Sequence, residues 1–263
     1  MRLLEIYRHP VKSFGGELLD AAELHDLGVK GDRRFMLIDA NDRFVSAREV
    51  PALLHWRAHW HDDGSLLLVA PNGASHRAQL GADTLDVTVW DDTFQALLCA
   101  ADTQAWLGTH LDWPARLVFV PDPSPRAVDP QYAQAGDAVS FADGYPILIV
   151  SDASLDELQA RAGLALSMRR FRPNLVISAT APHAEDQWRR LRIGECELEL
   201  VKPCVRCVLT TIDPITAEPH PEREPLRSLI QYRRGPKGVT FGMNALVRRG
   251  GLIRIDDPIE PLA

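Results

Sequence analysis

The sequence predicts a mainly β fold with some helices, in the α+β class. Most of its β-prone runs are short and end at Gly, Pro, Asn or Asp, which are turn-forming residues. One segment after residue 150 has the spacing of a helix cap. Of the 263 residues, 46% are hydrophobic, so the chain can bury one large core or two moderate ones. We therefore expect a folded globular protein.

The first half of the chain is predicted to form mainly an antiparallel sheet or barrel. Its β-prone runs lie at residues 3–7, 34–39, 43–47, 66–70, 85–90 and 117–120. The runs at 35–39 and 44–47 are joined by Ala-Asn-Asp-Arg, which predicts a β-hairpin. His55, His59 and His61 fall on one side of an alternating segment, which favours a solvated strand face over a metal site.

A Pro-rich stretch at 120–125 predicts a boundary between a domain at 1–120 and a domain at 121–263. Beyond it, a strand at 146–150 precedes a helix. Ser154 and Glu157 have capping-box spacing, so this helix should begin at Ser154 and end near Gly163. Further strands are expected at 174–178, 195–201, 208–212 and 251–255.

Charge and composition exclude several partners. The net charge of -7 and the lack of a continuous basic stripe argue against nucleic acid. No apolar stretch approaches the roughly 20 residues of a spanning helix, so no membrane partner is expected. The N-terminus has charges within its apolar run, which is typical of a first strand and not of a signal peptide. Four dispersed cysteines indicate reduced thiols, and we expect a cytoplasmic protein.

The segment from Lys202 to Pro214 contains Cys204 and Cys207, separated by two residues. A thiolate can bind a soft metal or act as a nucleophile, and the neighbouring Lys202 and Arg206 favour that charge state. The alternative is that Cys204 and Cys207 are small core residues beside a strand.

Other cysteine sites fit the sequence less well. A zinc site would need a second ligand pair, which does not follow downstream. A thioredoxin-like motif would start a helix, whereas a β-branched run follows here. No glycine-rich nucleotide-binding loop is present.

This segment resembles the C-terminal signature of MOSC-domain proteins, named after the C-terminal domain of molybdenum cofactor sulfurase. Other elements of the family occur along the chain in the family's order. They are YRHPVKS at 7–13, GDRRFML at 31–37, SARE at 46–49, DGYP at 143–146, FRPNLVIS at 171–178, EDQW at 185–188 and FGMN at 241–244. They span essentially the whole chain, which is similar to YcbX-like proteins and amidoxime-reducing components. The resemblance implies a MOSC β-barrel with a smaller β-rich N-terminal domain, in which the first strand reaches the cofactor site.

The resemblance implies a molybdenum cofactor, Mo-molybdopterin, with Cys207 as the metal ligand and catalytic residue and Cys204 as its neighbour. The family positions that contact this cofactor correspond to Lys12, Ser13, Arg172, Asn174 and Arg206. Arginine suits the cofactor phosphate because its guanidinium is a planar fork of donors.

Two further pairs of residues are candidates. In the family, one arginine that precedes a Phe contacts the cofactor. Here both Arg33 and Arg34 precede Phe35, so both are candidates. Ser151 and Asp152 stand between a strand and a helix start, where free N–H groups and the helix dipole favour an anion. Helix capping alone is the alternative for this second pair.

The implied activity is two-electron removal of oxygen from small N-hydroxylated compounds such as hydroxylamines and amidoximes. No cysteine follows Cys207, so electrons are expected from a separate ferredoxin-, cytochrome b5- or flavin reductase-like protein. Two alternatives remain. One is a module that binds the cofactor or carries sulfur on Cys207 without turnover, and the other is a metal-free β scaffold with structural cysteines.

Overall fold

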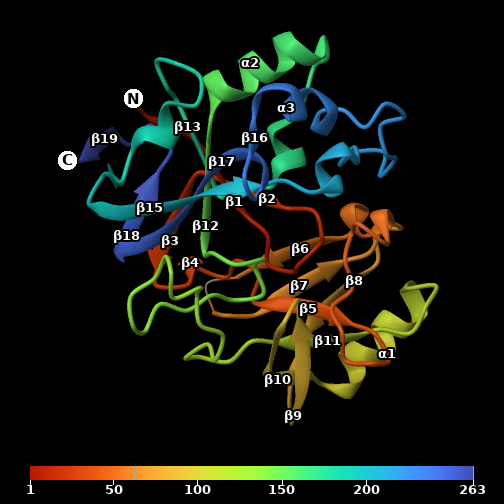
Figure 1. Ribbon diagram of the computed structural model, residues 1–263. Helices are drawn as coiled ribbons and strands as arrows, with labels where there is room; N and C mark the ends of the chain where they lie inside the picture. Colours follow the sequence, from red (N-terminus) through yellow and green to blue (C-terminus); the bar gives the residue numbers. More distant parts are fainter. Residues whose placement is uncertain (62, 263) are drawn as a thin grey trace.

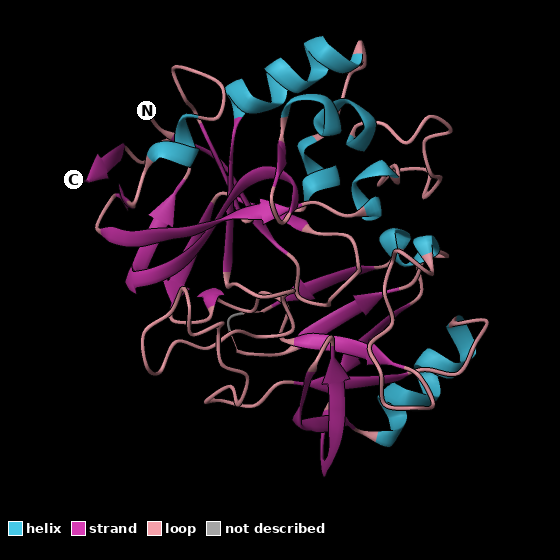
Figure 2. Cartoon of the chain, in the orientation of Figure 1, coloured by secondary structure: helices cyan, strands magenta, loops and turns pink. Residues whose placement is uncertain are grey.

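The computed structural model describes residues 1–61 and 63–262, and within them the fold is mainly β with three α-helices (Figure 1, Figure 2). The predicted mainly β fold with some helices is therefore confirmed. In the same residues the strands form four sheets. The N-terminal and C-terminal ends lie side by side, because Arg2 bridges Pro258 in an antiparallel pair.

The largest sheet has nine strands among the residues described, and most of them come from the second half of the chain. Its order is β19 (Ile259–Leu262), β14 (Arg190–Ile193), β15 (Cys196–Val205), β17 (Gly238–Arg249), β12 (Ile147–Ser151), β13 (Leu175–Ile177), β1 (Leu3–Arg8) and β2 (Glu17–Leu19), and β16 (Arg234–Gly235) pairs with β17. Strand β1 pairs antiparallel with β13. The first strand thus lies within the sheet of the second half.

Three smaller sheets complete the β structure. The first has the order β5 (Phe35–Ile38), β11 (Arg116–Phe119), β10 (Asp92–Cys99) and β9 (Leu80–Val89); the second β18 (Gly251–Arg254), β3 (Ala21–His25) and β4 (Gly28–Val29); the third β6 (Arg57–Trp60), β7 (Leu66–Val69) and β8 (Ser75–Ala78). Because β3 pairs with β18, strands from before residue 30 belong with the second half. The domain boundary at residue 120 stays a prediction.

The helices cover the outside of the sheets. They are α1 (Ala101–His110), α2 (Asp152–Ala162) and α3 (Leu226–Tyr232), with 3-10 helices η1 (Pro51–His55), η2 (Met168–Phe171), η3 (Ala184–Gln187) and η4 (Val208–Thr211). Helices α2 and α3 lie together beside the large sheet (Figure 1). Their Leu158 and Leu229 are fully buried against Val150 and Phe241. No helix in the described part is long and apolar enough to cross a membrane.

Helix α2 begins earlier than the capping-box spacing predicts. The cap is Ser151, whose Oγ accepts a hydrogen bond of 3.2 Å from the backbone N–H of Ser154. The capping residue therefore lies three positions before the expected one. The helix ends at Gly163, where φ is 65°, as the sequence predicts.

One predicted strand is wrong. The run at 208–212 forms η4, because the hydroxyls of Thr210 and Thr211 donate to carbonyls three residues back, at 3.0 and 2.7 Å, which favours a turn. The predicted hairpin forms over a short length. Ile38 bridges Phe44 in an antiparallel pair, the backbone N–H of Val45 donates to Leu37 and that of Asp39 donates to Arg43, both at 2.9 Å. The backbone N–H of Phe44 points away from β5 and donates to Thr88 of β9 at 3.2 Å.

Candidate functional site

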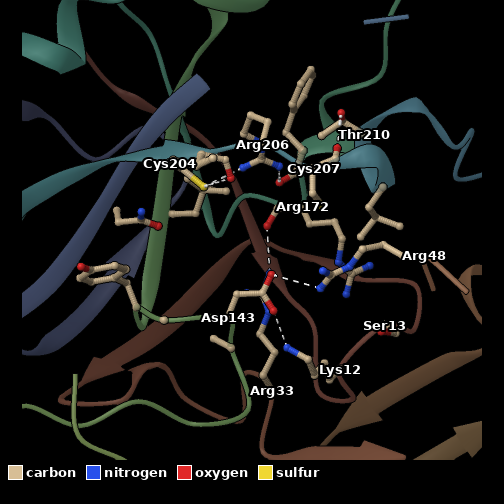
Figure 3. A pocket seen from close by; sticks show the side chains of 18 of the residues that line it. Lys12, Ser13, Arg33, Arg48, Asp143, Arg172, Cys204, Arg206, Cys207 and Thr210 are labelled. Atoms are coloured by element: carbon tan, nitrogen blue, oxygen red, sulfur yellow. Dashed lines mark hydrogen bonds and ion pairs between the residues drawn. The ribbon is translucent and has the colours of Figure 1, made fainter. Parts of the chain in front are cut away.

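A cleft lies where the large sheet meets the N-terminal half (Figure 3). Its walls come from the segment after β1, the turn before β5, the loop before β12, the segment between η2 and β13, and the segment between β15 and η4. The free space is only about 120 Å³, because charged side chains pair across it. An occupant must therefore replace some of these internal contacts.

Positive charge is concentrated in this cleft. Among the described residues that line it, six cationic side chains face a single carboxylate, that of Asp143. The cations are Lys12, Arg33, Arg48, Arg170, Arg172 and Arg206. The whole chain has a net charge of -7, so the local excess is opposite to the overall charge. Such a cleft attracts an anionic group.

Lys12 and Asp143 form the central ion pair of the cleft. The amine of Lys12 donates to the carbonyl of Phe141 at 2.8 Å and to Asp143 Oδ1 at 2.5 Å (Figure 3). Burial lowers the pKa of Lys12 to about 8, although Asp143 acts in the opposite sense. Burial would raise the pKa of Asp143, but the charges of Lys12 and Arg48 hold it well below its usual range. At neutral pH both groups are charged.

Arg33 and Arg172 support each other on one wall. Arg33 donates to Asp32 Oδ2 at 2.6 Å and to the carbonyl of Arg172 at 3.0 Å. Arg172 in turn donates to the carbonyl of Phe14 at 2.6 Å. Burial, together with the charge of Arg33, lowers the pKa of Arg172 to about 9. The two guanidiniums line the same cleft and favour an anion there.

Three cleft residues have a left-handed backbone conformation. The φ angles are 74° at Ser13, 46° at Arg33 and 52° at Arg172. This conformation is unfavourable for residues with a Cβ and occurs preferentially at functional sites. It therefore supports the assignment of this cleft as the functional site.

Asn174 has a positioning role below the cleft. Its side chain is buried, and its Oδ1 accepts hydrogen bonds of 3.1 Å from Arg33 and from the backbone N–H of Leu148. Its amide nitrogen donates to the carbonyl of Tyr7 at 3.3 Å. These bonds connect β1, β12 and Arg33, so Asn174 fixes the direction of the guanidinium.

Both cysteines of the motif line the cleft beside Arg206 (Figure 3). Arg206 Nη1 lies 2.9 Å from Cys204 Sγ, and Nη2 donates to the carbonyl of Phe171 at 2.6 Å. Arg206 Nε is buried and has no partner within residues 1–61 and 63–262. Cys207 precedes η4, and no described group forms a hydrogen bond with its sulfur. The guanidinium thus contacts Cys204, and the Cys207 thiol is uncommitted.

The structure brings seven of the candidate residues to the cleft: Lys12, Ser13, Arg33, Arg172, Asn174, Arg206 and Cys207. Arg34 does not line it. Its guanidinium donates to the carbonyl of Val120 at 2.7 Å and to Asp122 at 3.0 Å, and it lies over the Phe119 ring. Arg33 lies in a turn with a left-handed backbone, whereas Arg34 directly precedes β5, so the two side chains leave the chain in different directions.

Ser151 and Asp152 also lie outside the cleft. This corrects the expectation that they form part of the anion site. The carboxylate of Glu185 occupies the start of α2. It accepts from the backbone N–H and hydroxyl of Ser151 at 3.1 and 2.8 Å, and from the Ser154 hydroxyl at 2.8 Å. Asp152 Oδ1 accepts from the backbone N–H of Ala179. Of the first N–H groups of the helix, that of Ala153 donates to Asp152 Oδ1 and that of Ser154 to Ser151 Oγ, so side chains of the chain itself take the place of a bound anion.

Sequence reasoning did not single out seven polar or charged cleft residues among those described: Ser46, Arg48, Asp143, Arg170, Tyr145, Thr210 and Asn244. The first three lie in the SARE and DGYP elements, so membership of these elements was an available signal. Arg170 stands two residues before Arg172 and forms a 2.5 Å ion pair with Asp213. No feature of the sequence distinguished it from its arginine neighbours.

Two family models match this chain. The MOSC domain matches residues 136–260, and the MOSC N-terminal beta barrel domain matches residues 1–114. The fold and the cysteine-bearing cleft thus belong to a MOSC-domain protein, and the resemblance found in the sequence is confirmed.

Full-length relatives narrow the family. The chain is 31% identical to human mitochondrial amidoxime-reducing component 1, covering 97% of this chain and 81% of that protein. Mitochondrial amidoxime-reducing component 1 from mouse is 30% identical (97% and 80%), and that from zebrafish is 31% identical (95% and 82%). The chain therefore belongs to the MOSC-domain family that includes the amidoxime-reducing components.

Among solved structures, the YuaD protein from Bacillus subtilis aligns with a TM-score of 0.47 and 12% identity, covering 98% of this chain and 93% of that one.

The curated relatives are named as mitochondrial proteins, whereas the composition of this chain predicted a cytoplasmic one. Its location stays a prediction.

Proposed function

We propose that this chain binds the molybdenum cofactor through Cys207 and reduces N-hydroxylated small molecules. The observation that carries the proposal is the cleft itself, where an uncommitted Cys207 thiol lies on the wall of a strongly cationic site. Family membership adds support, because the relatives are named as amidoxime-reducing components.

The residues present fit such a cofactor. Arg206 Nε is a buried donor without a partner in the described residues, which is the type of group that a bound acceptor would satisfy. Lys12, Arg33 and Arg172 supply the charge for an anionic phosphate. A Cys207 thiolate would hold the metal as a soft ligand.

The cofactor would supply two-electron oxygen removal, converting an N–OH group with two protons into N–H and water. The chain would contribute binding and orientation. Lys12, with its pKa of about 8, is protonated at neutral pH and can hold an anion. Arg33 is held in place by Asp32 and Asn174, so this part of the site is preorganised. The electrons would come from a separate donor protein.

The test is molybdenum and pterin analysis of protein made in a cofactor-producing host, followed by hydroxylamine reduction with reduced viologen. We expect near-stoichiometric cofactor and turnover in the wild type. Cys207→Ser should lose the metal or change its coordination and lose activity, whereas Cys204→Ser should keep the metal. A fully active Cys207→Ser variant would contradict the ligand assignment.

The two alternatives give different results in the same assay. A wild type with bound cofactor and no turnover would be a cofactor-binding or sulfur-carrier module. A well-folded wild type without metal or pterin would be a scaffold, and the enzyme proposal would be wrong.

A further inference from the structure

A second hollow adjoins the cleft and shares the wall formed by Asp143, Gly144 and Tyr145. Its volume is about 660 Å³, compared with about 120 Å³ for the cleft. A volume of this size is typical of small-molecule sites, which range from about 300 to 1,000 Å³. A Cβ at Gly144 would meet no atom within 4 Å, so no side chain narrows the shared wall there.

The charge of the second hollow is opposite to that of the cleft. Among the described residues that line it, four carboxylates, those of Asp91, Asp92, Asp129 and Asp143, face two cations, Arg126 and Lys202. Arg126 is paired with Asp92 at 2.7 Å, and Asp143 is paired with Lys12. Neither Asp91 nor Asp129 forms an ion pair with any described residue. With these pairs set aside, the carboxylates of Asp91 and Asp129 face the single amine of Lys202, so the hollow keeps a small negative excess that favours a cation.

Aromatic rings complete the lining of the second hollow. Trp90 and Tyr145 line it, and the Trp90 side chain is exposed although its ring is large and apolar. The buried hydroxyl of Tyr145 has no partner within the described part of the chain. The amine of Lys202 lies 4.9 Å from the ring centre of Tyr132 and 5.8 Å from that of Tyr145. One face of each of these two rings is thus in contact with a cation of the chain itself, an arrangement that aromatic faces favour.

Trp90 is held at the rim by the hairpin between β9 and β10. Its φ is 57°, a conformation that is rare for a bulky residue and that favours glycine. The guanidinium of Arg48, a cleft residue, lies 4.4 Å from the centre of its ring. Arg48 and Trp90 therefore form a direct contact between the cleft and the second hollow.

We propose that the second hollow binds the remote part of the substrate and selects N-hydroxylated compounds in which this part is aromatic and positively charged. The inference rests on the proposed function, which puts the reacting N–OH group in the cleft. The cationic cleft would hold the anionic cofactor, and the acidic, aromatic hollow beside it suits a cation on the same substrate. Because the two hollows share Asp143, Gly144 and Tyr145, one molecule that extends past these residues would occupy both.

The test compares two amidoximes of equal shape, one N-hydroxybenzamidine with a para trimethylammonium group and one with a para tert-butyl group. The wild type should have a higher kcat/KM for the cationic compound. Asp91→Asn/Asp129→Asn should lower the cationic-to-neutral ratio about fivefold, as expected for the loss of two partly exposed charge contacts. The control Asp83→Asn/Asp112→Asn removes two exposed carboxylates outside the hollow and should keep the wild-type ratio.

Binding of the phenyltrimethylammonium ion, measured by calorimetry, provides a readout that does not depend on activity. Its Kd should rise about fivefold in Asp91→Asn/Asp129→Asn and remain unchanged in the control. If the wild type reduces hydroxylamine but Asp91→Asn/Asp129→Asn keeps the wild-type ratio and Kd, as the control does, the proposed subsite is wrong and the proposed function stands. If the wild type reduces no N-hydroxylated compound, the proposed function fails, and ion binding still decides whether the hollow is a cation site.

Discussion

Lys12 and Asp143 are separated by 131 residues in sequence, yet their side chains meet at 2.5 Å in the cleft. The pair connects the segment after β1 to the loop before β12. It also places a titrating amine beside the guanidiniums of Arg33 and Arg172. The ability of the cleft to bind an anion should therefore depend on pH.

We expect sulfate binding to weaken about fourfold from pH 7 to 8.5. The pKa of Lys12 is about 8, so the amine loses its positive charge as the pH rises through this range, and roughly a quarter remains protonated at pH 8.5. Sulfate does not titrate here, so calorimetry reports the protein alone. Lys12→Arg keeps its charge and should lose much less affinity. An equal loss in this variant would assign the pH dependence to another group.

Substitution of Arg33 should weaken anion binding, whereas substitution of Arg34 should lower stability. Arg33→Ala should weaken sulfate binding at least about tenfold, because it removes a charged donor from the cleft. Arg34→Ala should lower the free energy of unfolding by about 1–3 kcal/mol, because Asp122 and the Val120 carbonyl lose their partner. Its sulfate affinity should stay within about twofold. Calorimetry and urea denaturation of both variants test this, and loss of sulfate binding in Arg34→Ala would contradict it.

Glu185→Ala should lower the free energy of unfolding by about 3 kcal/mol without weakening sulfate binding. Glu185 is buried and accepts three hydrogen bonds from Ser151 and Ser154, which would lose their acceptor. Urea denaturation measures the loss. Glu195→Ala, at an exposed glutamate, is the control and should change stability little. A large loss of sulfate affinity in Glu185→Ala would indicate that the start of α2 serves the cleft after all.

Gly28→Ala should be much more destabilising than Gly73→Ala. Both glycines have a left-handed backbone, with φ of 93° and 87°. A Cβ at Gly28 would lie 2.4 Å from the carbonyl oxygen of Pro146, whereas one at Gly73 would meet no atom within 4 Å. We expect losses of about 3 and about 1 kcal/mol in urea denaturation, because only Gly28→Ala adds a steric clash to the backbone strain. Equal losses would mean that β4 moves away from Pro146 at little cost.

Local patterns in the sequence predicted those features that depend on neighbouring residues. Alternating apolar residues and turn formers located β1, β7, β11 and β12, and the left-handed Gly163 marked the end of α2. The pattern failed where nearby hydroxyls supplied competing hydrogen bonds. Thr210 and Thr211 turned a β-prone run into η4, whereas the expected hairpin forms with Ile38 opposite Phe44.

The sequence by itself determined the mainly β class, the family, and the segments from which the cleft is built, because these are written in residue types and their local spacing. Only the tertiary structure decided which side chains meet. It turned Arg33 into the cleft and Arg34 away from it, and it brought Glu185 to Ser151 from 34 residues along the chain. The physical reason is that charge pairing and burial act between atoms in space, whereas sequence patterns record only neighbours along the backbone.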